Sequence, residues 1–246
     1  MSTIAVLLIA VGVTDLLRPL TPGRWVPTAT ASALVVIGAV LCGLWHPGDL
    51  LLVGIAAVAA GGWELCCTAA EQWTGPRQAA PLLVFPGALL ALFLLSGFAS
   101  PVGGVVRTWW NWAEPAAGID PGKMVMVAAV TLIQLATANQ MVRLLLKSVG
   151  AVKPAGQPQP SDRLKGGRLL GPMERLLILG LGLAGQLTVA TAVIAAKSII
   201  RFPEINAQKS KREGGIGIDD ITEYFLIGSF ASWIVALGGL ALTFSR

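Results

Sequence analysis

Apolar runs long enough to cross a bilayer recur along this chain, and they constrain its fold more than any other feature. They cover residues 3–17, 29–45, 50–70, 82–98, 124–146, 174–200 and 222–243. About 20 apolar residues in a helix span about 30 Å of hydrocarbon. In total, 54% of the residues are hydrophobic and 13% are charged, against about 25% charged residues in soluble domains. The runs do not alternate apolar and polar residues, so we expect an all-α, polytopic transmembrane bundle of about seven spans.

A polar segment divides the chain into two unequal parts. Residues 148–173 are rich in Pro, Gly and charged residues, a composition typical of a flexible linker. The linker separates a five-helix part, residues 1–147, from a two-helix membrane hairpin, residues 174–246. Residues 101–122 contain too many Gly and Pro residues to form a span of their own.

The net charge of +5 comes from Lys and Arg residues in loops and at helix ends. Membrane orientation and contact with anionic lipid headgroups explain these residues, and no nucleic-acid-binding motif accompanies them. With seven spans, the side that holds the C-terminus receives slightly more of the basic residues. This excess predicts that the N-terminus lies outside and the C-terminus in the cytoplasm.

A polar stripe is the most specific pattern within the sixth span. Arg175, Gln186 and Lys197 are spaced by eleven residues, and Arg201 follows Lys197 by one turn. Three helical turns take about 10.8 residues, so these side chains would share one edge of a helix. Polar groups inside a membrane face protein or water rather than lipid. The stripe therefore predicts either hydrogen bonds between helices or a polar cavity.

The fifth span ends with a second polar group of side chains. Asn139, Gln140, Arg143 and Lys147 would lie on one side of its last turns. The same two interpretations apply to them, because they also interrupt an apolar helix.

Three carboxylates lie in or beside apolar runs. Asp15 is expected to pair with Arg18, which follows it by three residues on the same helix. Glu64 and Glu71 are seven residues apart and would share one side of the third helix, where they could relay protons or bind a cation. The interpretation that we favour is that this stretch is the interfacial end of the helix.

Tryptophans flank this stretch and recur further along the chain. Trp63 and Trp73 are expected to be belt residues at the membrane interface, where tryptophan is enriched. Trp109, Trp110 and Trp112 are likewise expected to anchor their segment at the interface rather than to form a ligand cage.

The C-terminal quarter resembles an uncharacterised family of bacterial integral membrane proteins. The resemblance rests on "ERLLIL", "AAKSIIRFPEI" and "EYFLIGSFAS" and covers residues 174–232. It implies the cytoplasmic membrane as the location, and no activity. The family's first helix has a histidine four residues before an aspartate, and here Val11 precedes Asp15. The positions characteristic of the family are Glu174, Arg175, Lys197, Ser198, Arg201, Phe202, Glu223 and Tyr224.

No nucleotide-binding, hydrolase or zinc-protease motif occurs in the chain, and we expect no catalytic residue, cofactor or metal. The favoured hypothesis is a non-catalytic membrane protein that contacts lipids and assembles with a partner protein or with a second copy of itself. Its docking site would comprise Arg175, Gln186, Lys197, Arg201, Glu223 and Tyr224.

Within this site, Lys197 and Arg201 would form ion pairs with Glu223, which begins the next helix. Two alternative functions are open. One is a transporter or channel for a small anionic solute. The other is an intramembrane lipid-modifying enzyme that uses Asp15, Glu64 or Glu71 as its acid–base group.

Overall fold

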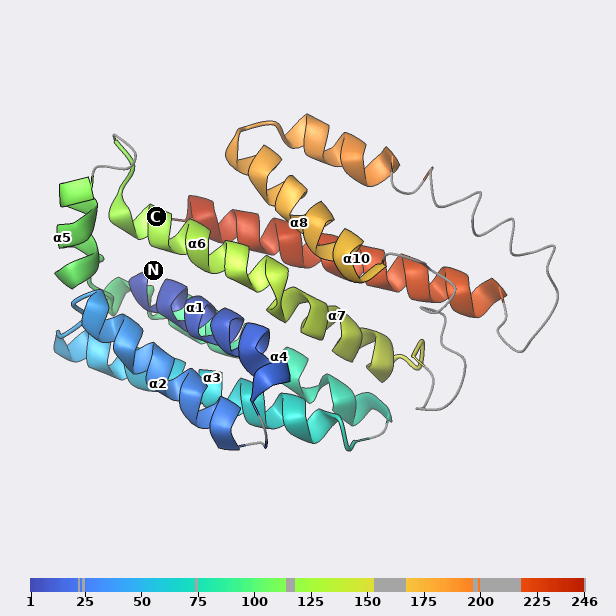
Figure 1. Cartoon of the computed structure of the whole chain (residues 1–246), viewed down its shortest axis with the longest axis horizontal. Coiled ribbons are helices and arrows are strands. Elements are labelled where there is room, and N and C mark those ends of the chain that lie inside the picture. Colours follow the sequence, from blue (N-terminus) through green and yellow to red (C-terminus); the bar gives the residue numbers. More distant parts are fainter. Residues whose placement is uncertain are drawn as a thin grey trace.

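The computed structural model describes residues 1–21, 23, 25–73, 75–113, 118–152, 167–196, 199 and 218–245. Figure 1 shows an elongated bundle in which most helices run along the long axis. The all-α class expected from the sequence is confirmed for these residues. The helices are α1 (Ser2–Leu17), α2 (Trp25–Leu41), α3 (Pro47–Ala70), α4 (Ala80–Leu94), α5 (Gly104–Ala113), α6 (Pro121–Leu135), α7 (Thr137–Ser148), α8 (Gly167–Leu183), the helix Leu187–Ala196 and α10 (Ile218–Phe244).

Helix α1 forms the core of the bundle. The five residues from Ile4 to Leu8 are each at most 2% exposed, and five consecutive residues point to every side of a helix. The helix packs against α2, α3 and α6. Gly12 permits the close approach of α6, because a Cβ atom there would lie 3.0 Å from Leu132 Cβ. A helix that is apolar on all sides is stable when other helices enclose it.

The fifth expected span, 124–146, consists of two helices in the structure. Helix α6 ends at Leu135, α7 begins at Thr137, and the two are bent by 43° at the break. A break of this kind leaves the last carbonyl groups of α6 without partners in their own helix. Polar side chains from elsewhere in the chain can therefore bind there.

The sixth expected span, 174–200, is not one helix either. Helix α8 begins at Gly167, inside the linker expected over 148–173, and ends at Leu183. The next helix covers Leu187–Ala196 and runs back in the opposite sense, so that it forms a hairpin with α8 (Figure 1). The single helix expected over 174–200 is therefore wrong.

A glycine cap causes this turn. Gly185 has a φ of +75°, a conformation that glycine adopts without steric cost. The N–H of Gly185 donates to Gly182 O at 3.0 Å, and that of Gln186 donates to Leu181 O at 2.8 Å. This pair of bonds is a Schellman cap, which ends a helix. Gln186 is exposed beyond the cap, so the prediction that it shares a helix edge with Arg175 is wrong.

Four described helices are long and apolar enough to cross a membrane, and a fifth is obtained if the bent pair of α6 and α7 counts as one span. Helix α2 and the helix Leu187–Ala196 are apolar but shorter. The structure thus supports a helical bundle with four or five helices of spanning length, and not the seven expected. The four are Ser2–Leu20, Pro47–Ala70, Arg77–Leu94 and Thr222–Phe244.

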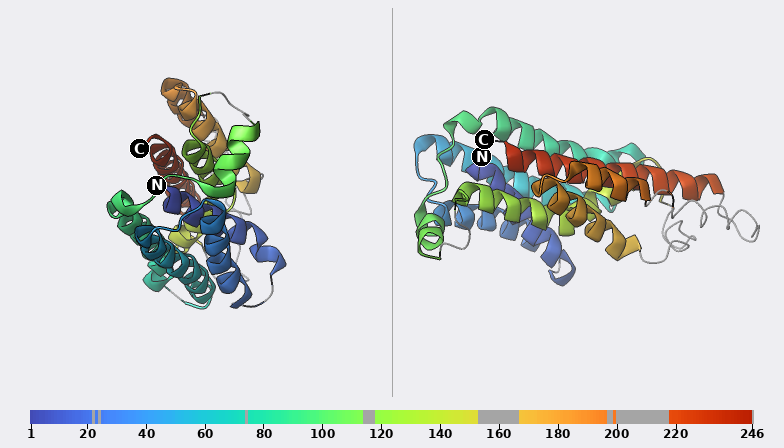
Figure 2. Two further views of the ribbon diagram at one scale, coloured as in Figure 1. Left: turned by 90° about the vertical axis from the view of Figure 1, so that its left-hand side faces the viewer. Right: turned by 90° about the horizontal axis from the view of Figure 1, so that it is seen from above.

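The first and last described residues lie at the same end of the bundle. Ser245 Oγ is 3.7 Å from Met1 Sδ, and Figures 1 and 2 draw the two ends close together. The hairpin of α8 and Leu187–Ala196 contributes to this arrangement of the two ends, because the chain turns back where a single helix would have continued (Figure 1). The side of a membrane on which each terminus lies stays a prediction.

Candidate functional site

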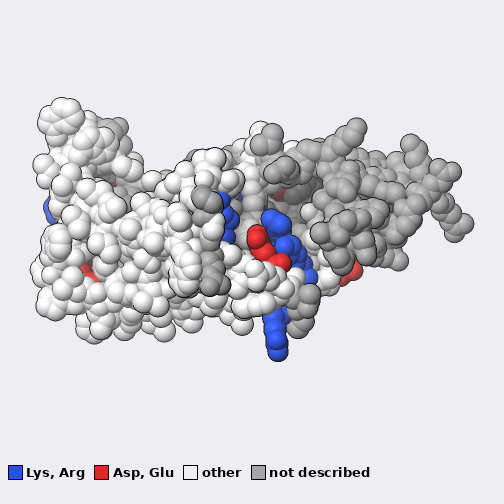
Figure 3. Space-filling view, turned by 60° about the horizontal axis from the view of Figure 1, so that its bottom comes forward, with Lys and Arg blue, Asp and Glu red and all other residues white. Residues whose placement is uncertain are grey.

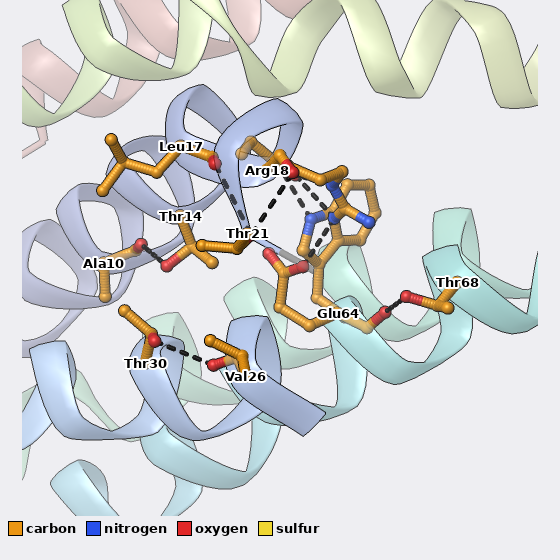
Figure 4. Close-up of polar contacts among 11 residues, drawn as sticks. Ala10, Thr14, Leu17, Arg18, Thr21, Val26, Thr30, Glu64 and Thr68 are labelled. Carbon is orange, nitrogen blue, oxygen red and sulfur yellow. Dashed lines mark hydrogen bonds and ion pairs between the residues drawn. The ribbon is translucent and has the colours of Figure 1, made fainter. Parts of the chain in front are cut away.

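A buried ion cluster joins α1 to α3. Arg18 Nη2 lies 2.7 Å from Asp15 Oδ1 and 2.7 Å from Glu64 Oε2. Trp63 Nε1 donates a hydrogen bond of 3.1 Å to Asp15 Oδ2. The exposed fractions of the side chains are 3% for Asp15, 0% for Glu64 and 21% for Arg18. Figure 4 shows Glu64 reaching from α3 towards Arg18. The Asp15–Arg18 pair expected from the spacing is confirmed.

Glu64 is buried inside the bundle, and whether this end of α3 lies at a membrane interface stays a prediction. Trp63 is fully buried and packs on Phe85 with ring centroids 5.1 Å apart, so it is not a belt residue. Glu71 is exposed at the end of α3 and acts electrostatically on Lys147 rather than on Glu64. The seven-residue spacing does not bring the two carboxylates into one site, because Glu64 is buried against Arg18 and Glu71 is exposed.

Arg175 of α8 is also buried, with 2% of its surface exposed. Its Nε and Nη2 atoms donate to Gln134 O at 3.1 and 2.9 Å. Nη1 donates to Ser232 Oγ at 3.0 Å, and Nη2 also donates to Asn139 Oδ1 at 2.6 Å. These four bonds join α8 to α6, α7 and α10, and all of their acceptors are uncharged.

The break between α6 and α7 explains why an arginine lies here. Gln134 belongs to the last turn of α6, whose carbonyl groups have no intrahelical partners. The planar guanidinium presents several donors in a fixed geometry and can bind such a carbonyl twice. The neighbouring Glu174 accepts a hydrogen bond of 2.8 Å from Trp233 Nε1. Both residues of α8 therefore fasten it to the rest of the bundle.

The polar side chains of α7 do gather on one side, as expected, but part of that side faces outward. Asn139 and Arg143, one turn apart, are exposed, while Gln140 and Lys147 are half-buried. Gln140 lies against Cys67 of α3. Figure 3 shows charged side chains gathered near the middle of the face that it draws, and few of them towards the α5 end.

Helix α5 lies across the end of the bundle (Figure 1). Trp110 of this helix is buried and donates a hydrogen bond of 3.0 Å from Nε1 to Ile119 O. Trp110 is therefore a packing residue and not an anchor. Trp109 and Trp112 are exposed and line an open groove together with Arg107. An interfacial role for these two tryptophans stays a prediction.

The remaining residues of the expected docking site are only partly placed. Glu223 is exposed and Tyr224 is half-buried in the first turns of α10. The predicted ion pairs of Glu223 stay a prediction, because their partners lie outside the described residues. The family positions outside the described residues are Lys197, Ser198, Arg201 and Phe202.

His46, Asp49 and Ser100 meet at the start of α3, but they do not form a catalytic triad. Ser100 Oγ lies 3.0 Å from His46 Nδ1, and Asp49 Oδ2 lies 3.5 Å from the same nitrogen. A triad uses the two ring nitrogens for different partners. Asp49 instead caps the helix, because its carboxylate accepts from the backbone N–H groups of His46 at 3.2 Å and Ser100 at 2.8 Å.

Sequence reasoning missed the partners of Arg175 and Glu64. Gln134 and Ser232 are 41 and 57 residues from Arg175, and no local spacing connects them. The signal that was available is the presence of a charged residue inside an apolar run, which requires a partner somewhere in the fold.

The described residues thus define a helical bundle with apolar helices of spanning length and two buried polar clusters. Within these residues, no group of three or more His, Cys, Asp or Glu side chains could hold a metal ion. No family model matches the chain, and neither the curated proteins nor the solved structures include a match.

Proposed function

We propose that this chain is an integral protein of a bacterial cytoplasmic membrane. Helices of sufficient length and hydropathy support this, and so does the outer surface of the bundle. Val58, Leu83 and Leu94 are among many large apolar side chains that are exposed on it. Soluble monomers rarely expose extended apolar surface, whereas hydrocarbon accommodates it.

The chain crosses the membrane six times. The crossings are α1, α2, α3, α4, the bent pair of α6 and α7, and α10. Helix α8 and the helix Leu187–Ala196 enter and leave the bundle at one end without crossing. An even number of crossings agrees with the contact between Met1 and Ser245. It replaces the seven crossings expected from the apolar runs.

The basic residues orient this topology. In this topology, the four connections that follow α1, α3, α7 and the helix Leu187–Ala196 would share one side of the membrane, and they contain most of the Lys and Arg residues. The other side would receive Arg107, Lys123 and Arg246. Positively charged loops remain in the cytoplasm, so both termini lie outside, in place of the cytoplasmic C-terminus expected at first. The basic residues of the four connections are Arg18, Arg24, Arg77, Lys153, Arg163, Lys165, Lys197, Arg201, Lys209, Lys211 and Arg212.

The chain works by assembling with a partner protein and does not itself catalyse a reaction. The observation that carries this proposal is the exposed Arg143 on α7, one turn after Asn139, whose amide group bonds to Arg175 and Leu135 within the chain. Asn139 is nine residues from the helix end at Ser148, which places it about 14 Å along the helix axis from that end. Polar groups at such a depth face protein or water rather than lipid. A second protein covers this face.

The partner presents hydrogen-bond acceptors, including a carboxylate, to this face. Within the described residues, Arg143 forms no salt bridge, so a carboxylate on the partner would neutralise it. Helix α10 packs against α7, and its first turns contain the exposed Glu223 and the half-buried Tyr224. The docking surface therefore combines α7 with the last helices of the chain. In this proposal the last helices keep the docking role expected from the sequence.

Photo-crosslinking in intact membranes tests this proposal. A photoreactive residue at position 139 or 143 should capture the same protein, and at the exposed apolar Ile234 it should capture only lipid. Capture at position 139 should be lost in the Arg143→Leu variant and persist in the Arg107→Leu variant. Lipid adducts alone at all three positions would contradict the proposal. Capture of a second copy of the chain would identify the partner as the chain itself.

A transporter for a small anionic solute is the second candidate, and the position of Arg175 favours it. Broken helices with polar groups near the middle of the membrane are typical of transporters. The hydrogen-bond acceptors of Arg175 are uncharged, and the carboxylate that acts on it is that of the neighbouring Glu174. Liposomes containing the protein should take up chloride, phosphate or a small carboxylate, and the Arg175→Gln variant should not. Absence of uptake by the unmodified protein would exclude this function for the anions tested.

A further inference from the structure

We infer that Glu64 is a proton-binding site inside the bundle, where its carboxyl group holds a proton at neutral pH and exchanges it with water past Arg18. This inference does not depend on the proposed docking role. It rests on the charges, the hydrogen bonds and the burial of the cluster that joins α1 to α3.

The charge balance of the cluster requires a proton. Asp15 and Glu64 together present two carboxyl groups to one guanidinium, that of Arg18. Asp15 and Arg18 are the charged groups of the described residues that act on Glu64. The other nearby polar groups, the thiol of Cys67 and the amide of Gln140, are uncharged. An uncompensated buried charge is costly, and a proton on one carboxylate removes it.

The hydrogen bonds decide which carboxyl group is protonated. Asp15 Oδ1 accepts from Arg18 Nε at 3.3 Å and Nη2 at 2.7 Å, and Oδ2 accepts from Trp63 Nε1 at 3.1 Å. Both oxygens of Asp15 therefore accept hydrogen bonds. Glu64 Oε2 is at ion-pair distance from Arg18, without the alignment of a hydrogen bond, and Oε1 has no partner. The ionised form of Glu64 is therefore the more costly of the two.

Arg18 connects this site to water. Its side chain is 21% exposed, whereas that of Glu64 is 0% exposed. Deprotonation breaks the O–H bond of Glu64, leaves the electron pair on the carboxylate and transfers the proton to water. The new carboxylate then competes with Asp15 for the guanidinium. Because Arg18 directly follows α1 and Glu64 belongs to α3, the bound proton controls the strength of the contact between these helices.

Infrared spectroscopy of the purified full chain in detergent tests this inference. The unmodified protein should show the C=O band of a protonated carboxylic acid at neutral pH, and the band should weaken at alkaline pH. Glu64→Gln should remove the band. Glu71→Gln, which changes an exposed carboxylate of the same region, should keep it. Retention of the band in Glu64→Gln, or its loss in Asp15→Asn alone, would overturn the inference.

A hydrophobic carbodiimide gives a measurement on the unmodified protein, because it reacts with protonated carboxyl groups. Labelling followed by peptide mass spectrometry should place the adduct on Glu64 at neutral pH and show less of it at alkaline pH. An adduct on Asp15 or Glu71 instead would contradict the assignment. This measurement needs no variant to fold.

The pH dependence of stability provides a third test. In the unfolded chain a glutamate is ionised at neutral pH, so the folded chain binds one proton more than the unfolded chain. The free energy of unfolding must then fall as pH rises above the unfolded pKa of glutamate, about 4.3, until Glu64 ionises in the folded chain. Glu64→Gln resembles the protonated form and should lack this decline. Equal pH dependence of the unfolding midpoints in both proteins would overturn the inference.

Discussion

Arg18 and Arg175 illustrate two ways in which single arginines are accommodated inside this bundle. Arg18 meets two carboxyl groups at the edge of the bundle, where part of its side chain reaches water. Arg175 is enclosed and meets only uncharged oxygens. In both cases one side chain joins several helices, so the loss of one side chain would affect more than one helix contact.

At this scale, Arg175→Lys should lower the thermal stability of the purified chain although it keeps the positive charge. An ammonium group cannot bind Gln134, Asn139 and Ser232 in the geometry of the planar guanidinium. A buried acceptor left without a donor costs about 1–3 kcal/mol. Arg107→Lys, on the exposed side of α5, is the matched control. Unfolding midpoints in detergent should fall for the first variant only, and equal midpoints would show that the bonds of Arg175 add little.

At the scale of helices, α10 fits against α6 at a glycine. A Cβ atom at Gly239 would lie 2.7 Å from Gln134 Nε2 and 2.7 Å from Val130 Cγ1. Gln134 Nε2 also donates to Val235 O at 3.2 Å, so the same contact contains a hydrogen bond between the two helices. The preceding Gly238 has no atom within 4 Å of such a Cβ atom. Two adjacent glycines of α10 therefore have different roles.

These two glycines lead to a paired prediction. Gly239→Ala should destabilise the chain by about 1–3 kcal/mol, because overpacking forces the neighbouring groups to move. Gly238→Ala should be neutral or slightly stabilising, since alanine has the higher helix propensity by about 1 kcal/mol. Chemical or thermal unfolding of both variants in the same detergent provides the comparison. A larger loss of stability in Gly238→Ala would contradict the described approach of α10 to α6.

At the scale of the whole molecule, the hairpin of α8 and Leu187–Ala196 determines the topology. It returns the chain to the end at which α8 began (Figure 1), and α10 then brings the C-terminus next to Met1. In the proposed six-crossing topology, the basic connections that follow α1, α3, α7 and the helix Leu187–Ala196 would fall on one side of the membrane. A seven-crossing arrangement would instead divide them almost equally between the two sides.

Epitope tags at the two termini should therefore be detected on the same side of the membrane. By the proposed orientation, antibodies should reach both tags in intact spheroplasts. A tag in the connection between α7 and α8 should become accessible only after the membrane is permeabilised. Detection of the terminal tags on opposite sides would refute the six-crossing topology. Detection of both only after permeabilisation would keep the topology and reverse its orientation.

Local features of the sequence determined the helical class, most helix positions and the Asp15–Arg18 pair. Run length, composition and an i,i+3 spacing are properties of neighbouring residues, and they act the same way in any fold. The sequence alone did not distinguish a helix cap at Gly185 from a glycine in the middle of a helix, because glycine also occurs inside membrane helices. Its hydrogen bonds to the preceding turn show that the chain ends a helix there.

Only the tertiary structure decided which residues the buried charges meet. Glu64 meets Arg18 because α1 lies in the core against α3, and Arg175 meets Gln134 because α6 breaks where α8 passes. The same structure brings the two termini together. These contacts join residues far apart in the chain. They depend on which helices pack together, and that is settled by the combined packing of all helices rather than by any local run of residues.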